Sequence, residues 1–166
     1  MSSQTQGATG YSTAEWELLV ELPELVVIAA TSAEADGMRR TVDEGLAGDQ
    51  AIEAGRHSDS PLVRRIAAEL WTGDDTAAEP QPTAVEFNDR RQGLADVLAK
   101  ARRAAAMLAG RAAPADARAY RDWLLAIAKH VCAAARSGGF LGIGGEQIST
   151  AERAFLAELD GALRLP

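Results

Sequence analysis

Six helix-start signatures divide the chain into helix-length segments, and they constrain the fold more than any other feature. Ser or Thr followed three residues later by Glu forms a capping box, in which both side chains satisfy backbone amides that lack partners within the helix. The pattern occurs at Ser12/Glu15, Thr41/Glu44, Thr83/Glu86 and Ser149/Glu152. Ser60 before Pro61 is a fifth start, and Pro114 is a sixth. Helix-start signals that recur along the whole chain predict an all-helical protein.

Apolar residues recur at helical spacing after these starts, which supports the same fold class. After Pro61 they are Leu62, Val63, Ile66, Ala67, Leu70 and Trp71. After Pro114 they are Tyr120, Trp123, Leu124, Ile127, Val131 and Cys132. No alternating pattern persists beyond a few residues, so we expect no β-sheet. The sequence predicts an all-α, compact bundle of about five to seven helices, and Pro23 is expected to kink or split the first of them.

The length of 166 residues, with 47% hydrophobic and 25% charged residues, is typical of one globular domain. Residues 1–10 are small and polar, so we expect a disordered tail followed by a single helical domain over residues 11–166. One cysteine cannot form an internal disulfide framework. No stretch resembles a signal peptide or a membrane span. We therefore expect a cytoplasmic protein without membrane insertion.

The net charge of −7 argues against a nucleic-acid partner, because DNA and RNA favour clustered Lys and Arg. Basic pairs such as Arg64-Arg65 and Arg102-Arg103 stand among acids, and we interpret them as solvated helix faces. A protein partner or a homo-oligomer remains compatible with this composition.

Catalytic motifs are few. The glycine-rich connector over residues 137–149 lacks the Gly-Lys-Ser/Thr of a phosphate loop. His130 and Cys132 lie two apart on one expected helix, so they point in different directions and cannot serve one reacting atom. Cys132 falls in an apolar stripe and is expected in the core. These observations favour a protein that is not an enzyme.

Acidic residues are the better candidates for a site. Glu34, Asp36, Asp43 and Glu44 surround the Asp36-Gly37 turn. Glu146 and Glu152 flank another expected turn before the last helix. Oxygen ligands on turns suit a divalent metal ion such as magnesium or calcium. The alternative is that Asp36 only ends a helix and that Glu44 and Glu152 only cap helix N-termini, where a carboxylate is favourable in any case.

Two short motifs carry a family resemblance. The segments are AEADGMRRTVDE, at the first turn, and GGEQISTAERAFLAELDGAL, near the C-terminus. Together with Leu22-Pro23, they resemble the TerB-like tellurite-resistance family over about residues 22–46 and 144–165. The resemblance implies a helical bundle with a pseudo-repeat, a link to stress or tellurite response, and acids that contact a metal ion. On this chain those acids are Asp36, Glu44, Glu146 and Glu152.

Three hypotheses about function follow. The first is a non-catalytic, stress-related or tellurite-related module that binds a divalent metal ion or a protein partner through its acidic turns. The second is a ligand-free interaction or homodimerisation domain, which an exposed apolar stripe on the helix over residues 83–110 would favour. The third is an enzyme, which needs a pocket of about 300 Å³ or more with converging polar groups.

Overall fold

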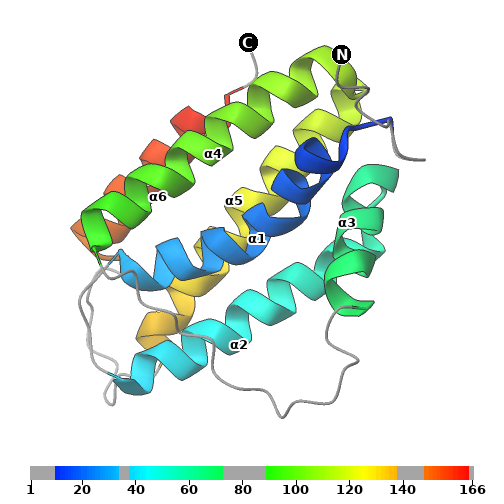
Figure 1. Cartoon of the computed structure of the whole chain (residues 1–166). Helices are drawn as coiled ribbons and strands as arrows, with labels where there is room; N and C mark the ends of the chain where they lie inside the picture. The colour runs from blue at the N-terminus through cyan, green and yellow to red at the C-terminus, as the bar shows by residue number, and fades with distance from the viewer. Residues whose placement is uncertain (1–9, 34–37, 73–88, 138–147, 165–166) are drawn as a thin grey trace.

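The computed structural model describes residues 10–33, 38–72, 89–137 and 148–164. Within these ranges the chain forms six α-helices and one 3-10 helix, and no β-strand (Figure 1). The elements are α1 (Thr13–Ser32), α2 (Met38–Ala54), η1 (Gly55–His57), α3 (Pro61–Thr72), α4 (Arg90–Arg111), α5 (Pro114–Ser137) and α6 (Thr150–Ala162). The prediction of an all-α, compact bundle of five to seven helices is confirmed.

Two of the predicted capping boxes form as the sequence indicates. Ser12 and Ser149 are the N-caps of α1 and α6, and in both boxes each side chain bonds to the backbone amide of the other residue. In the second box the amide of Ser149 donates to the Oε2 atom of Glu152 at 2.7 Å. In the first box, hydrogen bonds from Ser12 are the main cause that holds the pKa of Glu15 below its usual value.

The two proline-marked starts are also confirmed. Helix α3 begins at Pro61, and the hydroxyl of Ser60 accepts a hydrogen bond from the amide of Val63 at 3.3 Å. The same hydroxyl donates to the Oδ1 atom of Asp116 at 2.6 Å. Because Asp116 lies in the first turn of α5, which begins at Pro114, this bond joins the starts of two helices.

Of the other two predicted starts, the one at Thr41 does not hold and the one at Thr83 stays a prediction. The capping box at Thr41 is wrong, because α2 already begins at Met38 and Thr41 lies inside it. Met and Arg are good helix formers, so the helix extends past the Thr signal toward its N-terminus. Thr83 lies outside the described residues. Helix α4 is capped by Asp89, which is extended and accepts a hydrogen bond from the amide of Gln92, so α4 does not run back to Thr83.

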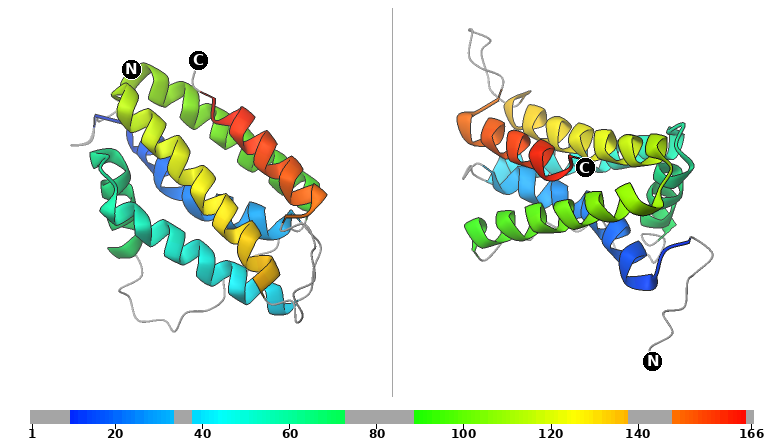
Figure 2. Two further views of the ribbon diagram at one scale, coloured as in Figure 1. Left: turned by 180° about the vertical axis from the view of Figure 1, so that it is seen from behind. Right: turned by 90° about the horizontal axis from the view of Figure 1, so that it is seen from above.

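Helix α5 is the centre of the bundle, because it contacts each of the other five α-helices (Figure 2). Helix α2 lies along much of its length, and α1 and α6 pack against its other sides. Its predicted apolar stripe is buried. The buried residues are Tyr120, Trp123, Leu124, Ile127, Val131 and Cys132. The expectation that Cys132 is a core residue is therefore confirmed.

Pro23 neither splits α1 nor leaves its backbone unsatisfied. The helix is continuous from Thr13 to Ser32 with Pro23 inside it. Proline has no N–H, so the carbonyl of Leu19, four residues earlier, loses its usual partner within the helix. The hydroxyl of Tyr120 on α5 donates to that carbonyl at 2.9 Å, and both side chains are fully buried. A side chain from the central helix thus replaces the bond that proline removes.

A second aromatic residue of α5 makes a similar bond to α2. The indole Nε1 of Trp123 donates to the carbonyl of Ala51 at 3.0 Å, in the last turn of α2. The Trp123 and Tyr120 rings meet edge to face, with centroids 6.1 Å apart. Gly55, directly after α2, lies against the indole, because a Cβ atom there would be 2.6 Å from two of its ring carbons. The close approach of α2 and α5 therefore requires glycine at this position.

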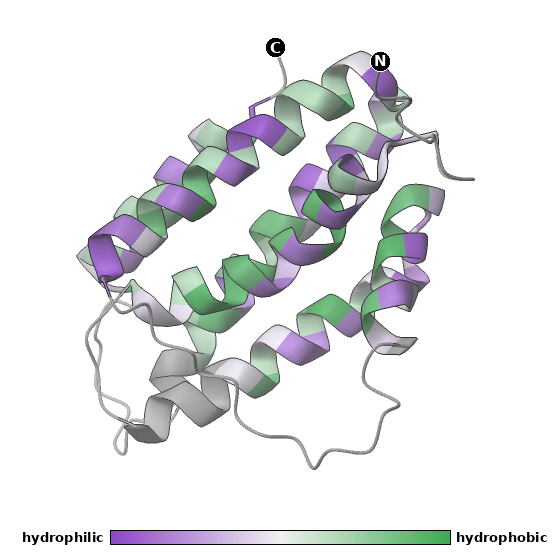
Figure 3. Ribbon diagram, in the orientation of Figure 1, coloured by the Kyte–Doolittle hydropathy of each residue, from purple (hydrophilic) through white to green (hydrophobic). Residues whose placement is uncertain are grey.

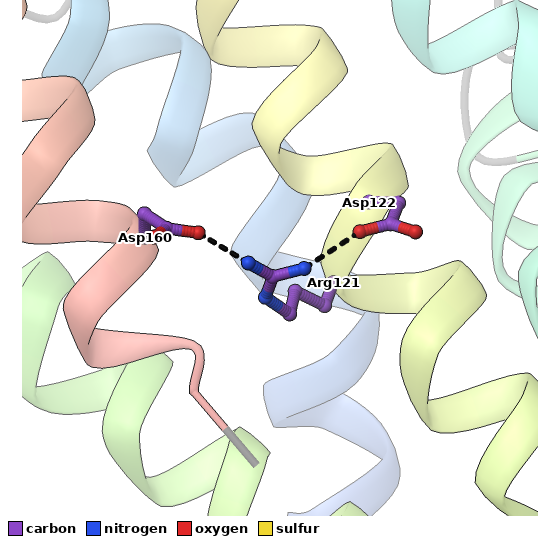
Figure 4. Close-up of polar contacts among 3 residues, drawn as sticks. All are labelled: Arg121, Asp122 and Asp160. Carbon is purple, nitrogen blue, oxygen red and sulfur yellow. Dashed lines mark hydrogen bonds and ion pairs between the residues drawn. The ribbon is translucent and has the colours of Figure 1, made fainter.

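Polar contacts at the surface tie helices together as well. The guanidinium of Arg121 on α5 forms an ion pair with Asp160 on α6 and also contacts Asp122 (Figure 4). Arg90 at the start of α4 donates to the carbonyl of Ala33, at the C-terminal end of α1. The last carbonyls of a helix lack partners within it, so this contact satisfies one of them.

Trp71 departs from its predicted place. Its spacing puts it on the apolar face of α3, yet 49% of the residue is exposed, and the guanidinium of Arg56 lies 5.2 Å from its ring centre. Trp71 is next to the last residue of α3. Figure 3 shows hydrophobic and hydrophilic segments following one another along the helices where they are coloured. None of the described helices combines the length and apolar character needed to cross a membrane.

Candidate docking groove

Of the acids expected to bind a metal ion, one can be placed with its side chain. Asp36 and Glu146 lie outside the described residues, and Glu44 lies in α2 with its side chain outside them. The described residues contain no group of three or more His, Cys, Asp or Glu that could hold a metal ion. The shared metal site at the two turns therefore stays a prediction.

The remaining acid, Glu152, takes part in capping the N-terminus of α6. It is 2% exposed, and its carboxylate accepts the amide of Ser149 at the start of α6. Its own amide donates to the Ser149 hydroxyl at 3.1 Å. This agrees with the capping interpretation of Glu152, since the carboxylate faces the helix N-terminus that it satisfies.

Replacing Glu152 by alanine is expected to destabilise the protein by about 0.5–2 kcal/mol, because the cap loses its reciprocal bond. Glu152→Gln, which keeps an acceptor in the box, is the matched control and should lose less. Thermal unfolding with a chelator and then with calcium, magnesium, manganese or zinc separates the two roles. An equal loss in all conditions is the expected result, whereas a loss confined to one metal would restore the metal-site hypothesis.

His130 and Cys132 do not form a catalytic pair. Cys132 is 1% exposed, whereas His130 is exposed and its Nδ1 atom lies 3.0 Å from the carbonyl of Ala126 on its own helix. Because a carbonyl can only accept, Nδ1 is the donor in this contact. The two side chains occupy different surroundings, as their spacing predicts.

A groove between α1 and α3 is the site best suited to a ligand among the described residues. It has a volume of about 350 Å³. Its floor is apolar, and its rim carries four carboxylates. The floor residues are Trp16, Val20 and Leu70, and the rim residues are Glu17, Glu21, Glu24 and Glu69. We call this surface the α1/α3 groove.

Trp16 is held in place on three sides. Its indole Nε1 donates to the Oε2 atom of Glu69 at 2.7 Å, which links α1 to α3. The Arg65 guanidinium lies 5.3 Å from one Trp16 ring centre, and the Tyr11 ring centre lies 6.2 Å away. A half-buried, oriented tryptophan loses little conformational freedom when a ligand binds, so it is well suited to anchor one.

The rim of the groove is acidic because of the composition of α1. That helix contains four glutamates and no basic residue. Glu17, Glu21 and Glu24 follow a spacing of four and three residues, so they share the exposed face of the helix. On the side toward α4, Glu21 pairs with Lys100 at 2.8 Å. An apolar floor with an acidic rim matches a ligand that is apolar on one face and cationic around it.

Two other hollows fit a ligand less well. One, of about 510 Å³ between α4 and α6, has Leu94 and Leu98 on its floor, but Arg91 and Glu158 give its edge both signs of charge. The other, of about 210 Å³, lies beside Trp123 and His130 and is smaller than typical ligand sites. Neither gathers groups of one chemical kind as the α1/α3 groove does.

Sequence reasoning missed this groove. The acids of α1 carry a signal, because Glu17, Glu21 and Glu24 line one helix face. Their partners on α3, Glu69 and Leu70, come more than 40 residues later, and nothing in the sequence pairs α1 with α3. The pattern alone is also the usual pattern of a solvated helix face.

Comparison of the chain with protein-family models, with curated proteins and with solved structures finds no match. The resemblance to the TerB-like family is therefore supported only by the two motifs that carry it, and it stays a prediction.

Proposed function

We propose that the protein is a non-catalytic helical interaction module whose α1/α3 groove binds a basic, amphipathic segment of a partner protein. The observation that carries the proposal is the joint presence of an anchored tryptophan and four carboxylates around one apolar floor. Helices that bind in grooves present an apolar face to such a floor and place charged residues along its edges. The proposal keeps the first hypothesis but moves the contact from the acidic turns to this groove.

The contacts within the groove support a role in binding more than a role in catalysis. The carboxylate of Glu69 is engaged by the Trp16 indole, and that of Glu21 by Lys100. Trp16 is a residue type that often contributes much of the binding energy at protein interfaces, and Val20 and Leu70 extend the apolar surface beside it. The carboxylates mainly select the sign of the partner's charge and speed its association.

A synthetic peptide provides the test. The probe is a fluorescent, amphipathic helix of about 18 residues with leucine on one face and lysine on the other. Binding is measured by fluorescence anisotropy. We expect saturable binding that weakens at least about tenfold between roughly 50 mM and 500 mM NaCl, because salt screens the exposed charges.

A pair of charge-matched variants locates the binding. Glu17→Lys with Glu24→Lys should weaken peptide binding at least about tenfold, or about 1.4 kcal/mol. Glu53→Lys with Glu158→Lys changes the net charge by the same amount on exposed positions of α2 and α6, and it should bind nearly as the parent does. Equal weakening in both variants would show that only overall charge matters and would refute the groove as the site.

A further inference from the structure

We propose that the basic segment that enters the α1/α3 groove belongs to a second copy of this chain, and that it is the outer face of α4. This inference rests on the proposed function, because it names the partner of the same groove. We define the outer face of α4 as the exposed residues Ala95, Ala99, Arg102, Arg103 and Ala106.

The charge of α4 is opposite to that of the groove. The helix carries six basic residues and one acidic residue, so its net charge is +5 within a chain whose net charge is −7. Figure 3 shows hydrophilic segments recurring along it. Its one acid, Asp96, accepts a hydrogen bond from the side chain of Gln92 at 2.8 Å. The basic residues of this chain are therefore concentrated on the helix that the acidic groove could receive.

The shape of the outer face suits a groove as well. Arg102 and Arg103 project among alanines, and both are exposed. The small alanine side chains let the α4 backbone approach the apolar floor closely, while the long arginines can reach carboxylates at the rim. Among the described residues Lys100 and Arg111 form ion pairs with Glu21 and Glu15 of the same chain, whereas Arg102 and Arg103 form no such pair, although Arg103 lies close enough to Glu15 to lower its pKa.

The positions of the two surfaces allow both contacts to form at once. Helices α1 and α4 pack against each other, and seen from above they lie on one side of the molecule with α5 and α6 on the other (Figure 2). Helix α3 packs against α1 and completes the groove. A twofold axis can therefore place the α4 of each copy in the groove of its partner, which closes the assembly as a dimer.

Sedimentation velocity on the full chain tests this inference. At about 100 μM protein and low salt we expect a dimer, because small interfaces commonly have micromolar Kd values. High salt should shift it to monomer. Glu17→Arg with Glu24→Arg makes the groove basic as well as α4, because the two remaining glutamates, Glu21 and Glu69, are offset by Lys100 and Arg65 beside them. Arg102→Glu with Arg103→Glu makes the outer face of α4 acidic as well as the groove. Each double variant alone should be monomeric, with helical circular dichroism retained.

Mixing the two variants is the decisive step. In the mixture every basic surface meets an acidic one, so a heterodimer should form although neither variant dimerises alone. The expected result is the formation of a complex, and a variant that fails to fold could not form it. A monomeric parent at low salt, double variants that still dimerise, or a mixture that stays monomeric would each overturn the inference. Peptide binding to the groove would still stand in that case and would point to a different basic partner.

Discussion

Tyr120→Phe is expected to lower the free energy of unfolding by about 1–3 kcal/mol, although it removes one oxygen atom only. The lost hydroxyl leaves the carbonyl of Leu19 buried without a partner, because Pro23 has no N–H to offer it. For a chain of this length the loss corresponds to a fall in Tm of roughly 2–4 °C for each kcal/mol. Urea denaturation followed by circular dichroism measures it.

Pro23→Ala provides the control that isolates this cause. Alanine restores an N–H four residues after Leu19, so the carbonyl regains a partner within α1. In that background Tyr120→Phe should cost less than half of what it costs in the parent. The double-mutant cycle should therefore show coupling of about 1 kcal/mol or more between two residues that lie on different helices. An equal cost in both backgrounds would mean that the hydroxyl does not replace the missing amide.

Alkaline pH acts on the same contact. Burial raises the pKa of Tyr120 well above 10.0, so the folded protein keeps the hydroxyl proton at a pH where the unfolded chain releases it. The stabilisation from Tyr120 is therefore fully present below pH 10.0 and is lost as the pH rises toward the folded-state pKa. Tyr120→Phe should show a smaller fall in stability over that range.

Gly55→Ala is expected to destabilise the protein by about 1–3 kcal/mol, because the new methyl group overlaps the indole of Trp123. The Cβ atom would lie 2.6 Å from two ring carbons and 2.8 Å from Nε1. The ring has little room to move, since it is 8% exposed and bonded to the carbonyl of Ala51. The accommodation must therefore come from a shift of η1 or α5, which weakens that bond.

The control for this prediction is a glycine substitution that is expected to raise stability instead of lowering it. Gly45 lies in α2, and a Cβ atom there would meet nothing within 4 Å. Gly45→Ala should therefore stabilise the protein by about 0.5–1 kcal/mol, because alanine is the better helix former. Thermal unfolding should place the two variants on opposite sides of the parent. If Gly55→Ala were as stable as the parent, the close approach of η1 and the indole would be refuted.

The helices could be predicted from sequence because their signals are local. Each capping box at Ser12 and Ser149 involves residues three apart, and it forms wherever the helix begins. The Thr41 signal failed because good helix formers precede it, and a capping residue inside a helix is outcompeted by the backbone hydrogen bonds around it. The apolar residues of α5 are buried as their spacing predicts, because other helices surround this helix. Trp71, next to the end of α3, stays half exposed and lies beside the Arg56 guanidinium instead of in the core.

The candidate site could not be predicted because it depends on contacts between distant residues. From sequence alone, Pro23 predicts a kinked or split helix. The hydrogen bond that satisfies the Leu19 carbonyl comes from Tyr120, almost 100 residues later, and no local pattern indicates it. From sequence alone, the spacing of Glu17 and Glu24 predicts a solvated helix face. Only the position of α3 beside them shows that they line a groove. The acids at the expected turns were more visible in the sequence, but the one that can be placed, Glu152, is used to cap its helix.

The location of peptide binding is the most direct test of the central proposal, and the indole N–H signals of the three tryptophans report it. Each signal is assigned in a ¹H–¹⁵N spectrum by a Trp→Phe variant, and the protein is then titrated with the leucine-lysine peptide. We predict that the Trp16 signal shifts progressively, since its N–H bonds to Glu69 within the groove, while the buried Trp123 signal stays in place. A Trp16 signal that does not move at saturating peptide, or a shift confined to Trp123 or Trp71, would contradict the assignment of the α1/α3 groove as the docking site.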